Sequence, residues 1–251
     1  MTPRLPTGSR PVLAGVGAFV VVFVLIVGGT LGVHALTVGR SSPSPTASPT
    51  SGPTATPSET ESEDAAQDEE WCWTPTRFDR TSTNPPDRLR GGGLELEIPD
   101  VFNDRRDMSY AAFTNDSVLA AAHVEEDWSS TVGVAKVEWQ PGIEYPGDKE
   151  ASSRILDCLV SKSSLWGDTT GRELEDEKTT EVTVDGMKGY RTSGKLTFDS
   201  SSLKKTSASG LTVIVVDTPE GPSVFVSESA IGVEEHEKAA EQAENSLSGL
   251  T

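Results

Sequence analysis

Cysteine, histidine and aromatic residues are all scarce in this chain of 251 residues, and aromatics make up only 6% of it. The two cysteines, Cys72 and Cys158, are too far apart for a C-x-x-C redox motif. The three histidines, His34, His123 and His236, have no metal-ligand spacing, and neither cysteine has a second ligand nearby. No G-x-S-x-G nucleophile elbow occurs either. We therefore predict no catalytic residues, no metal site and no cofactor.

Acidic residues are absent from residues 1–58. Glu59 is the first of 39 acidic residues, whereas three of the 21 basic residues, Arg4, Arg10 and Arg40, precede it. The segment from Glu59 onwards therefore carries a large negative charge. Such a segment repels nucleic acid, so we predict no nucleic-acid partner. A solvated acidic surface explains this charge, and a docking face for a basic partner is the alternative.

Formal charge is also absent between Arg10 and Arg40. Residues 12–33 within this interval are almost wholly apolar, and about 20 such residues span the roughly 30 Å hydrocarbon layer as a helix. The sequence predicts a single transmembrane signal-anchor helix over residues 11–36. Because Arg4 and Arg10 precede it, residues 1–10 are expected to form a cytoplasmic tail and everything after the helix to lie outside the cell membrane.

Cleavage of this segment is the alternative to a retained anchor. Val33 and Ala35 place small residues at the −3 and −1 positions of a possible signal-peptidase site after Ala35. The apolar run is longer than a typical signal-peptide core, which favours the retained anchor. Lipidation would need a cysteine directly after the run, and none precedes Cys72. Both readings predict export.

A linker follows the apolar segment, over residues 37–70. Ser, Thr and Pro occupy 16 of the 20 positions in residues 41–60, and residues 61–70 contain six acidic residues. Such a segment has too little apolar surface to offset the entropy of folding, so we predict a disordered, extended spacer. Its Ser/Thr/Pro composition also permits O-glycosylation.

A folded domain is predicted from Trp71 to the end of the chain, residues 71–251. The alternation of residues 94–98 predicts a strand, and residues 132–139 predict another with apolar residues on both faces. Hairpins are expected around the turn pairs Asn115-Asp116 and Asp185-Gly186, and between residues 211–216 and 223–227.

Two helices complete the expected elements. One runs from Asp148, as its N-cap, to about residue 163, with Ala151, Ile155, Cys158 and Leu159 on one face. The other covers residues 234–248, where small apolar residues suit close packing on a sheet. These elements predict an α+β fold, an antiparallel sheet with helices packed on it.

The order of these elements resembles the PsbP-like fold. The segments that carry the resemblance are G-L-E-L-E-I-P-D-V-F (93–102), I-L-D-C-L-V (155–160) and T-V-D-G-M-K-G-Y-R (183–191). The chain is similar over about residues 90–250 to actinobacterial envelope proteins of the LpqN type, although it lacks their lipidated cysteine. The resemblance implies an α/β/α sandwich that acts by contacting a partner, without catalysis, and it transfers no functional residue.

Cys72 and Cys158 are an even pair in a domain expected to be exported, and such compartments favour disulfides. We predict a bond between them, with two buried free thiols as the alternative.

Three further motifs each have a structural and a functional interpretation. Arg77, Arg80, Arg88 and Arg90 form the one basic stretch of the acidic domain; they could pair with nearby acids or form a contact patch for an anionic wall polymer. The acids of residues 125–127 fall between two predicted strands, which favours a solvated loop over acid–base work. The glycines of residues 91–93 precede a strand and not a helix, which favours a flexible entry to the strand over a phosphate site.

Three functions are consistent with the sequence. The first is a non-enzymatic, membrane-anchored envelope protein that presents its acidic domain for contact with a protein or with the cell wall. The second is an extracytoplasmic domain that binds a small ligand or lipid, with hydrolysis as a variant, and a deep apolar pocket with convergent polar groups would favour it. The third is a transmembrane sensor, which would need an intracellular partner because its predicted tail is so short.

Overall fold

The computed structural model describes residues 71–199 and 201–250. The predicted tail, anchor helix and linker lie outside these residues and stay predictions. Among the residues that the structure describes, no helix combines the length and apolar character needed to cross a membrane. In chain order, the elements are β1 (Arg88–Gly91), β2 (Leu94–Glu97), β3 (Asp104–Arg106), β4 (Thr114–Glu125), β5 (Trp128–Val137), α3 (Asp148–Ser161), the 3₁₀ turn η1 (Ser163–Leu165), β6 (Glu173–Val184), β7 (Met187–Thr197), β8 (Ala208–Thr218), β9 (Gly221–Ala230), α4 (Glu234–Asn245) and β10 (Ser248–Gly249).

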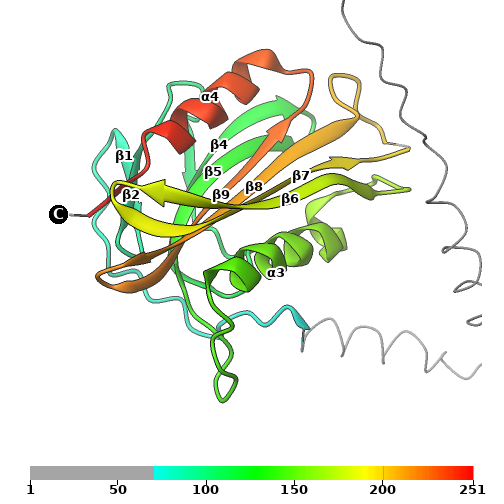
Figure 1. Cartoon of the computed structure of the whole chain (residues 1–251). Coiled ribbons are helices and arrows are strands. Elements are labelled where there is room, and N and C mark those ends of the chain that lie inside the picture. Colours follow the sequence, from blue (N-terminus) through cyan, green and yellow to red (C-terminus); the bar gives the residue numbers. More distant parts are fainter. Residues whose placement is uncertain (1–70, 200, 251) are drawn as a thin grey trace, which may run out of the picture. The chain divides into compact units, whose positions relative to one another are not determined.

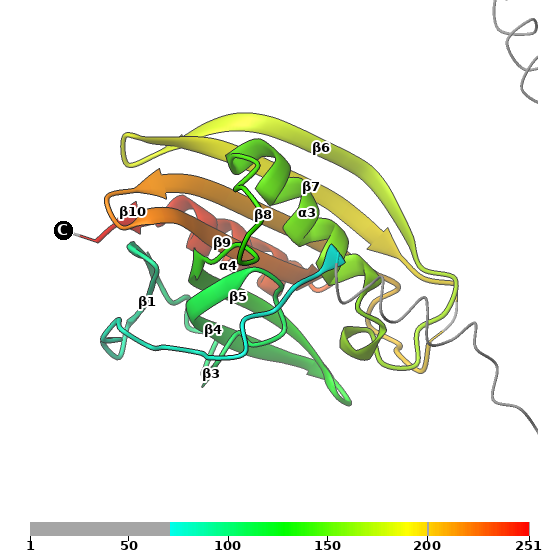
Figure 2. The same cartoon turned by 90° about the horizontal axis from the view of Figure 1, so that it is seen from below.

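A seven-stranded antiparallel sheet forms the centre of the fold, in the order β3-β4-β5-β9-β8-β7-β6. Helices α3 and α4 lie on its two opposite faces (Figure 1). From below, α3 lies in front of the sheet and α4 behind it (Figure 2). The predicted α+β class, with helices packed on an antiparallel sheet, is confirmed.

Two hydrophobic clusters, one on each face of the sheet, form the core. On the α3 face, Ile155 and Leu156 pack with Leu211 and Val213, and on the α4 face Ala239 and Ala243 pack with strand residues such as Phe225. The alanines of α4 bring its axis close to the sheet. A second, three-stranded sheet, β1-β2-β10, covers the rest of the α4 face with buried leucines.

Helix α3 carries the predicted apolar face, and Ala151, Ile155, Cys158 and Leu159 are all buried. Its ends differ from the prediction. Asp148 is not the N-cap, because Gly147 occupies that position and the Asp148 carboxylate accepts a hydrogen bond of 2.7 Å from the Tyr145 hydroxyl. The helix also ends at Ser161, after which the chain tightens into η1.

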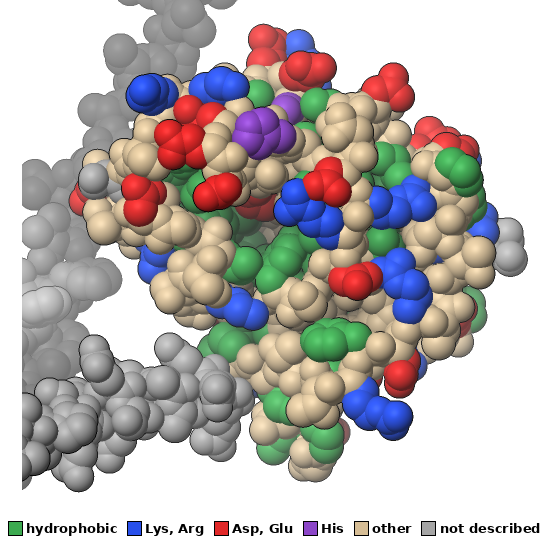
Figure 3. All heavy atoms as spheres, turned by 180° about the vertical axis from the view of Figure 1, so that it is seen from behind, with side chains coloured by type: hydrophobic (Ala, Val, Ile, Leu, Met, Phe, Trp, Pro, Cys, Tyr) green, Lys and Arg blue, Asp and Glu red, His purple; other side chains and the backbone are tan. Residues whose placement is uncertain are grey.

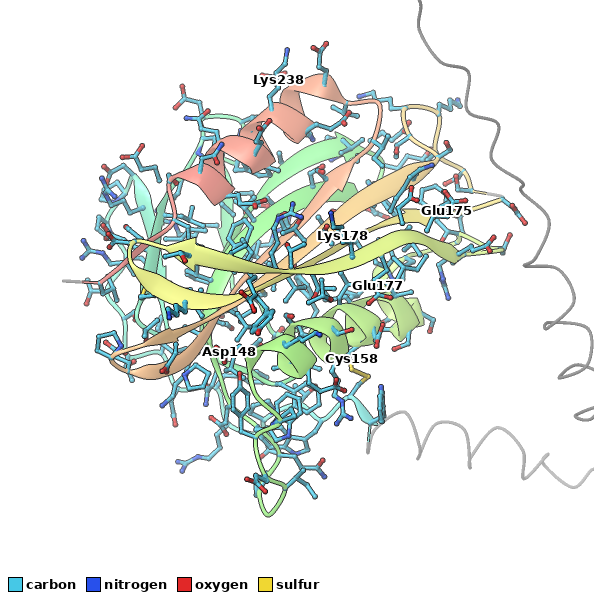
Figure 4. The ribbon with its side chains drawn as sticks, in the orientation of Figure 1. Asp148, Cys158, Glu175, Glu177, Lys178 and Lys238 are labelled. Atoms are coloured by element: carbon cyan, nitrogen blue, oxygen red, sulfur yellow. A yellow bond between two sulfur atoms is a disulfide. The ribbon has the colours of Figure 1, made fainter. Side chains whose placement is uncertain are left out.

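The hairpin at Asp185-Gly186 is confirmed, and both residues have the positive φ angles, 48° and 83°, of a type I′ turn. The hairpin between β8 and β9 and the final helix are confirmed as well. Strand β6 begins at Glu173, well before the predicted strand at residues 181–184. The first half of this edge strand is highly charged and includes Glu175, Glu177 and Lys178 (Figure 4).

The predicted hairpin around Asn115-Asp116 is wrong. Both residues lie inside β4, where the pairing with β5 is interrupted by a bulge between Asn115 and Val118. Asp116 has a φ of 45°, and its carboxylate accepts hydrogen bonds from Thr81 N, Ser82 N, Ser82 Oγ and Gly92 N at 2.6–3.0 Å. The pair thus forms a bulge in place of a turn, and the hydrogen bonds of Asp116 connect β4 to the preceding chain.

The glycines of residues 91–93 do not form a flexible entry, as the sequence suggested. They form the buried turn between β1 and β2, and Gly92 and Gly93 have φ angles of 60° and 87°. A Cβ atom on Gly92 would overlap the main chain of Lys136 in β5. Close packing, and not flexibility, explains the glycine here.

The predicted disulfide between Cys72 and Cys158 is present, with the two Cα atoms 5.5 Å apart. It ties the beginning of the described chain to the sheet-facing side of α3, and the bond is visible beside Cys158 (Figure 4).

Candidate ligand pocket

A small pocket opens on the α3 face of the main sheet, beside η1 and the turn between β4 and β5. Its volume is about 200 Å³. Seen from behind, the domain surface is hollowed, with hydrophobic side chains in the hollow and charged side chains around it (Figure 3). The aliphatic wall consists of Leu159, Leu165, Leu211 and Val226.

Aromatic rings form a second wall. The rings of Trp128, at the start of β5, and Trp166, just after η1, lie 5.8 Å apart between centroids and are tilted by 44°. Trp166 Nε1 donates a hydrogen bond of 2.8 Å to Leu159 O, which fixes that ring against the end of α3. Phe198 also packs on Trp128, with centroids 5.6 Å apart.

Trp128 also carries an unsatisfied donor. The side chain is 8% exposed, and Nε1 has no hydrogen-bond partner among the described residues. A buried donor without an acceptor costs about 1–3 kcal/mol. Such a group in the wall of a pocket would gain free energy from an acceptor supplied by a ligand.

Glu228 is the acidic group of the pocket. It lies on β9, opposite Thr131 of β5 and Leu211 of β8, and so in the middle of the sheet. Burial raises the pKa of its carboxyl group to about 7, although a hydrogen bond of 2.6 Å from Ser209 Oγ acts in the opposite direction. None of the basic side chains in the described part of the chain forms an ion pair with it.

Tyr110 completes the polar side. Its hydroxyl lies 3.1 Å from Thr131 Oγ1. Burial raises the pKa of Tyr110 to about 12; the hydrogen bond with Thr131 lowers it, and the nearby charge of Glu228 raises it further. Tyr110 therefore stays protonated and offers a neutral hydroxyl. At the rim, Arg106 is held by Asp104 through Nε at 2.8 Å.

The pocket can bind a ligand but shows no catalytic arrangement. A Ser–His pair does exist elsewhere, because His236 Nδ1 lies 3.1 Å from Ser130 Oγ. Ser130 is fully buried and its hydroxyl already accepts a hydrogen bond from Ala230 N, so the pair holds α4 to the sheet. In the described part of the chain, no cluster of three or more His, Cys, Asp or Glu side chains is placed to hold a metal ion.

Other hollows of the surface are less suited to a ligand. One hollow of about 730 Å³ runs between α4 and strands β7 to β9 and has many charged side chains in its lining. Arg191 and Glu244 within it satisfy one another, with Nε and Oε1 2.7 Å apart.

Three of the four predicted arginines pair with nearby acids. Arg80 contacts Asp107, and Arg88 and Arg90 both contact Glu95. The fourth, Arg77, is exposed, and its main-chain oxygen accepts a hydrogen bond from Asn115. The structure places none of them at the pocket, and a wall contact through them stays a prediction.

Glu126 and Asp127 lie in the turn between β4 and β5, as expected, whereas Glu125 is the last residue of β4. Glu125 accepts hydrogen bonds from the main chain of Lys204 and Lys205, so it anchors the loop before β8. Asp127 stands at the rim of the pocket. No sequence pattern links Asp127 with Glu228.

No protein-family model and no curated protein matches the chain. Among solved structures, the domain is similar to the solution structure of cyanobacterial PsbP (CyanoP) from Synechocystis sp. PCC 6803. That match has 11% identity and a TM-score of 0.41 and covers 70% of this chain and 100% of that one. A crystal structure of a protein of unknown function from Pseudomonas aeruginosa matches with 12% identity and a TM-score of 0.30, over 65% of this chain and 96% of that one. Neither likeness bears on function.

Proposed function

We propose that the domain is a binding module that takes a small ligand into the pocket between Trp128, Trp166 and Glu228, without a chemical step. One observation carries the proposal: a carboxyl group with a pKa near 7 lies in a pocket whose aliphatic and aromatic walls are joined by the polar side chains of Arg106, Asp127, Ser129 and Thr131. Perturbed ionisable groups in apolar pockets mark functional sites more often than other surface features. This favours the second of the three sequence hypotheses.

The size of the pocket limits the ligand. Its volume of about 200 Å³ is below the roughly 300–1,000 Å³ of pockets that enclose drug-sized molecules. A small metabolite, or one end of a longer molecule, matches this volume.

The place of binding follows from the predicted anchor. We propose that residues 11–36 hold the chain in the cell membrane and that residues 37–70 carry the domain away from it, as an envelope protein related to the LpqN type. In that setting the domain would bind a ligand outside the membrane, either to sense it or to pass it to a partner.

Fluorine NMR on the full chain tests the binding proposal. The chain contains five tryptophans, and fluorotryptophan labelling gives each its own resonance, assigned through single Trp→Phe variants. We expect at least one member of a chemically mixed panel of small fragments to shift the resonances of Trp128 and Trp166 in a saturable manner. The resonances of Trp71 and Trp73 serve as internal controls, because neither residue lines the pocket.

Absence of any saturable shift at Trp128 and Trp166 across cationic, neutral and anionic fragments would contradict the proposal. Saturable shifts confined to Trp71 or Trp73 would contradict it as well.

Contact with an envelope protein is the second candidate, and exposed apolar side chains favour it. Trp71, Phe78 and Ile143 are 50%, 50% and 55% exposed. Photo-crosslinkers at Phe78 and Ile143 of the full chain in intact cells test it. A single discrete adduct supports a contact surface, and no adduct at either position counts against it.

A further inference from the structure

We propose that the ligand is a small organic cation, an amine or a quaternary ammonium group, held between Glu228 and the rings of Trp128 and Trp166. This inference rests on the proposed binding function and adds the chemical class of the ligand.

The unbalanced charge of Glu228 is the first reason. Ser209 is the one side chain of the described residues that donates a hydrogen bond to it, and no Lys or Arg there pairs with it. Glu228 is half-buried, and a carboxylate that is partly removed from water is stabilised by an ion pair, by hydrogen bonds or by taking up a proton. A ligand cation would supply the missing partner and restore the ionised form.

The basic side chain in the pocket lining is already paired. Arg106 lies at the rim, where Asp104 accepts hydrogen bonds from its guanidinium group. Its charge is neutralised there, and it does not serve as the counter-ion of Glu228. The protein thus brings negative charge to the pocket without bringing a free positive one.

The aromatic walls are the second reason. Tryptophan is the best ring for a cation–π contact, and the contact is strongest when the cation is desolvated. Trp128 and Trp166 form a corner of two tilted rings, and Tyr110 adds a third aromatic side chain to the lining. Aromatic rings around an acidic group are the arrangement that recognises quaternary ammonium ions.

The third reason is the polarity of the remaining groups. The Tyr110 hydroxyl and the unpartnered Nε1 of Trp128 both provide donors. A cation that also carries a hydroxyl or carbonyl oxygen would satisfy a donor as well as the carboxylate. An anion would instead face Glu228 and, at the rim, Asp127.

Two probes of equal shape separate charge from size: choline and its uncharged analogue, in which a quaternary carbon replaces the nitrogen. Binding of each to the full chain is measured by calorimetry at pH 8, with the fluorine resonance of Trp128 as a second readout. We expect choline to bind at least tenfold more tightly than its analogue. Glu228→Gln should abolish this preference, whereas Glu241→Gln on the exposed side of α4 should keep it.

Lowering the pH to 5 should weaken the binding of choline, because Glu228 is then protonated and must release its proton before it can pair with the cation. The binding of the uncharged analogue should change little.

The outcomes distinguish the two proposals. Tighter binding of the uncharged analogue, or a choline affinity that Glu228→Gln leaves unchanged, overturns the cation inference but leaves the pocket as a binding site. No effect of either probe, or of any fragment of the mixed panel, at Trp128 overturns both.

Discussion

Ser209 Oγ donates a hydrogen bond of 2.6 Å to Glu228 Oε1 across the neighbouring strands β8 and β9. This bond holds the carboxyl group in place on the inner face of the sheet, where it meets the pocket. It does not offset the cost of burial, because the pKa of Glu228 is still raised to about 7.

Glu228 should therefore lower the stability of the domain at neutral and alkaline pH. Its folded-state pKa lies above the unfolded value of about 4.3, so ionisation in the unfolded state weakens folding as the pH rises from about 4 to about 7. Below pH 4 both states are protonated and the effect disappears. We expect Glu228→Gln to raise the free energy of unfolding by about 1–3 kcal/mol at pH 8 and to have little effect at pH 4. Denaturant unfolding at both pH values measures this.

Glu241→Gln removes the same charge from an exposed position and should show no such dependence on pH. An equal effect of Glu228→Gln at pH 4 and pH 8 would show that Glu228 has an ordinary pKa.

Asp116 should have the opposite effect. Burial alone would raise its pKa, but the hydrogen bonds from Ser82, Gly92 and Thr81 outweigh burial and lower it. Its stabilisation is therefore present above the unfolded pKa of about 3.9 and is lost as the pH falls through the lower, folded pKa. Asn tolerates the positive φ, so Asp116→Asn keeps the backbone but removes the charge and replaces one accepting oxygen with an NH2 group that cannot accept. We expect it to cost about 2–3 kcal/mol at pH 7.

The exposed Asp100→Asn is the matched control. Urea unfolding at pH 7 and at pH 2 should show that the gap between wild type and Asp116→Asn narrows in acid. A gap that stays constant, or that Asp100→Asn reproduces, argues against a role for the carboxylate charge.

The disulfide between Cys72 and Cys158 should be a large contributor to stability. The bond spans a sequence separation of 86 residues. The chain-entropy model assigns about 4–5 kcal/mol to a loop of this length, as an upper value. Thermal or denaturant unfolding with and without reductant, and of the Cys72→Ser, Cys158→Ser double variant, should show a clear loss. Two titratable thiols in the unreduced protein would be incompatible with the bond.

Gly92 and Gly186 offer a test of the turn between β1 and β2. Both have positive φ, but a Cβ atom would overlap β5 at Gly92 and would meet nothing within 4 Å at Gly186. We expect Gly186→Ala to cost about 1 kcal/mol, the backbone penalty alone, and Gly92→Ala to cost about 3 kcal/mol or more. Similar costs at the two positions would favour the flexible turn that the sequence suggested.

Local patterns were enough to predict much of this fold. Alternation identified β2, the Asp185-Gly186 pair identified the β6–β7 hairpin, and the apolar stripe of α3 placed Cys158 on its inner face. The first half of β6 was missed because an edge strand exposed to water carries charges in place of an apolar face.

The Asn115-Asp116 pair was misplaced for a related reason. The residue types that favour a turn also favour a bulge within a long strand, and only the partners of the Asp116 carboxylate decide between them.

The pocket was not predicted, although one part of it left a signal. Val224 and Val226 face the α3 side of the core, and period two places Glu228 on the same inner face. An acid two positions beyond two buried valines is a candidate for a perturbed pKa. Its neighbours come from β5, η1 and the β4–β5 turn, and no local pattern reveals that these segments meet.

Contact between ligand and pocket is measured most directly by intermolecular nuclear Overhauser effects on the full chain, with the tightest-binding probe of the fragment panel. We expect cross-peaks from the probe to the indole rings of Trp128 and Trp166, and their loss in Glu228→Gln if the probe is a cation. Cross-peaks from a saturably bound probe to Trp71 or Trp73 alone, with none to Trp128 or Trp166, would contradict the assignment of this pocket as the binding site.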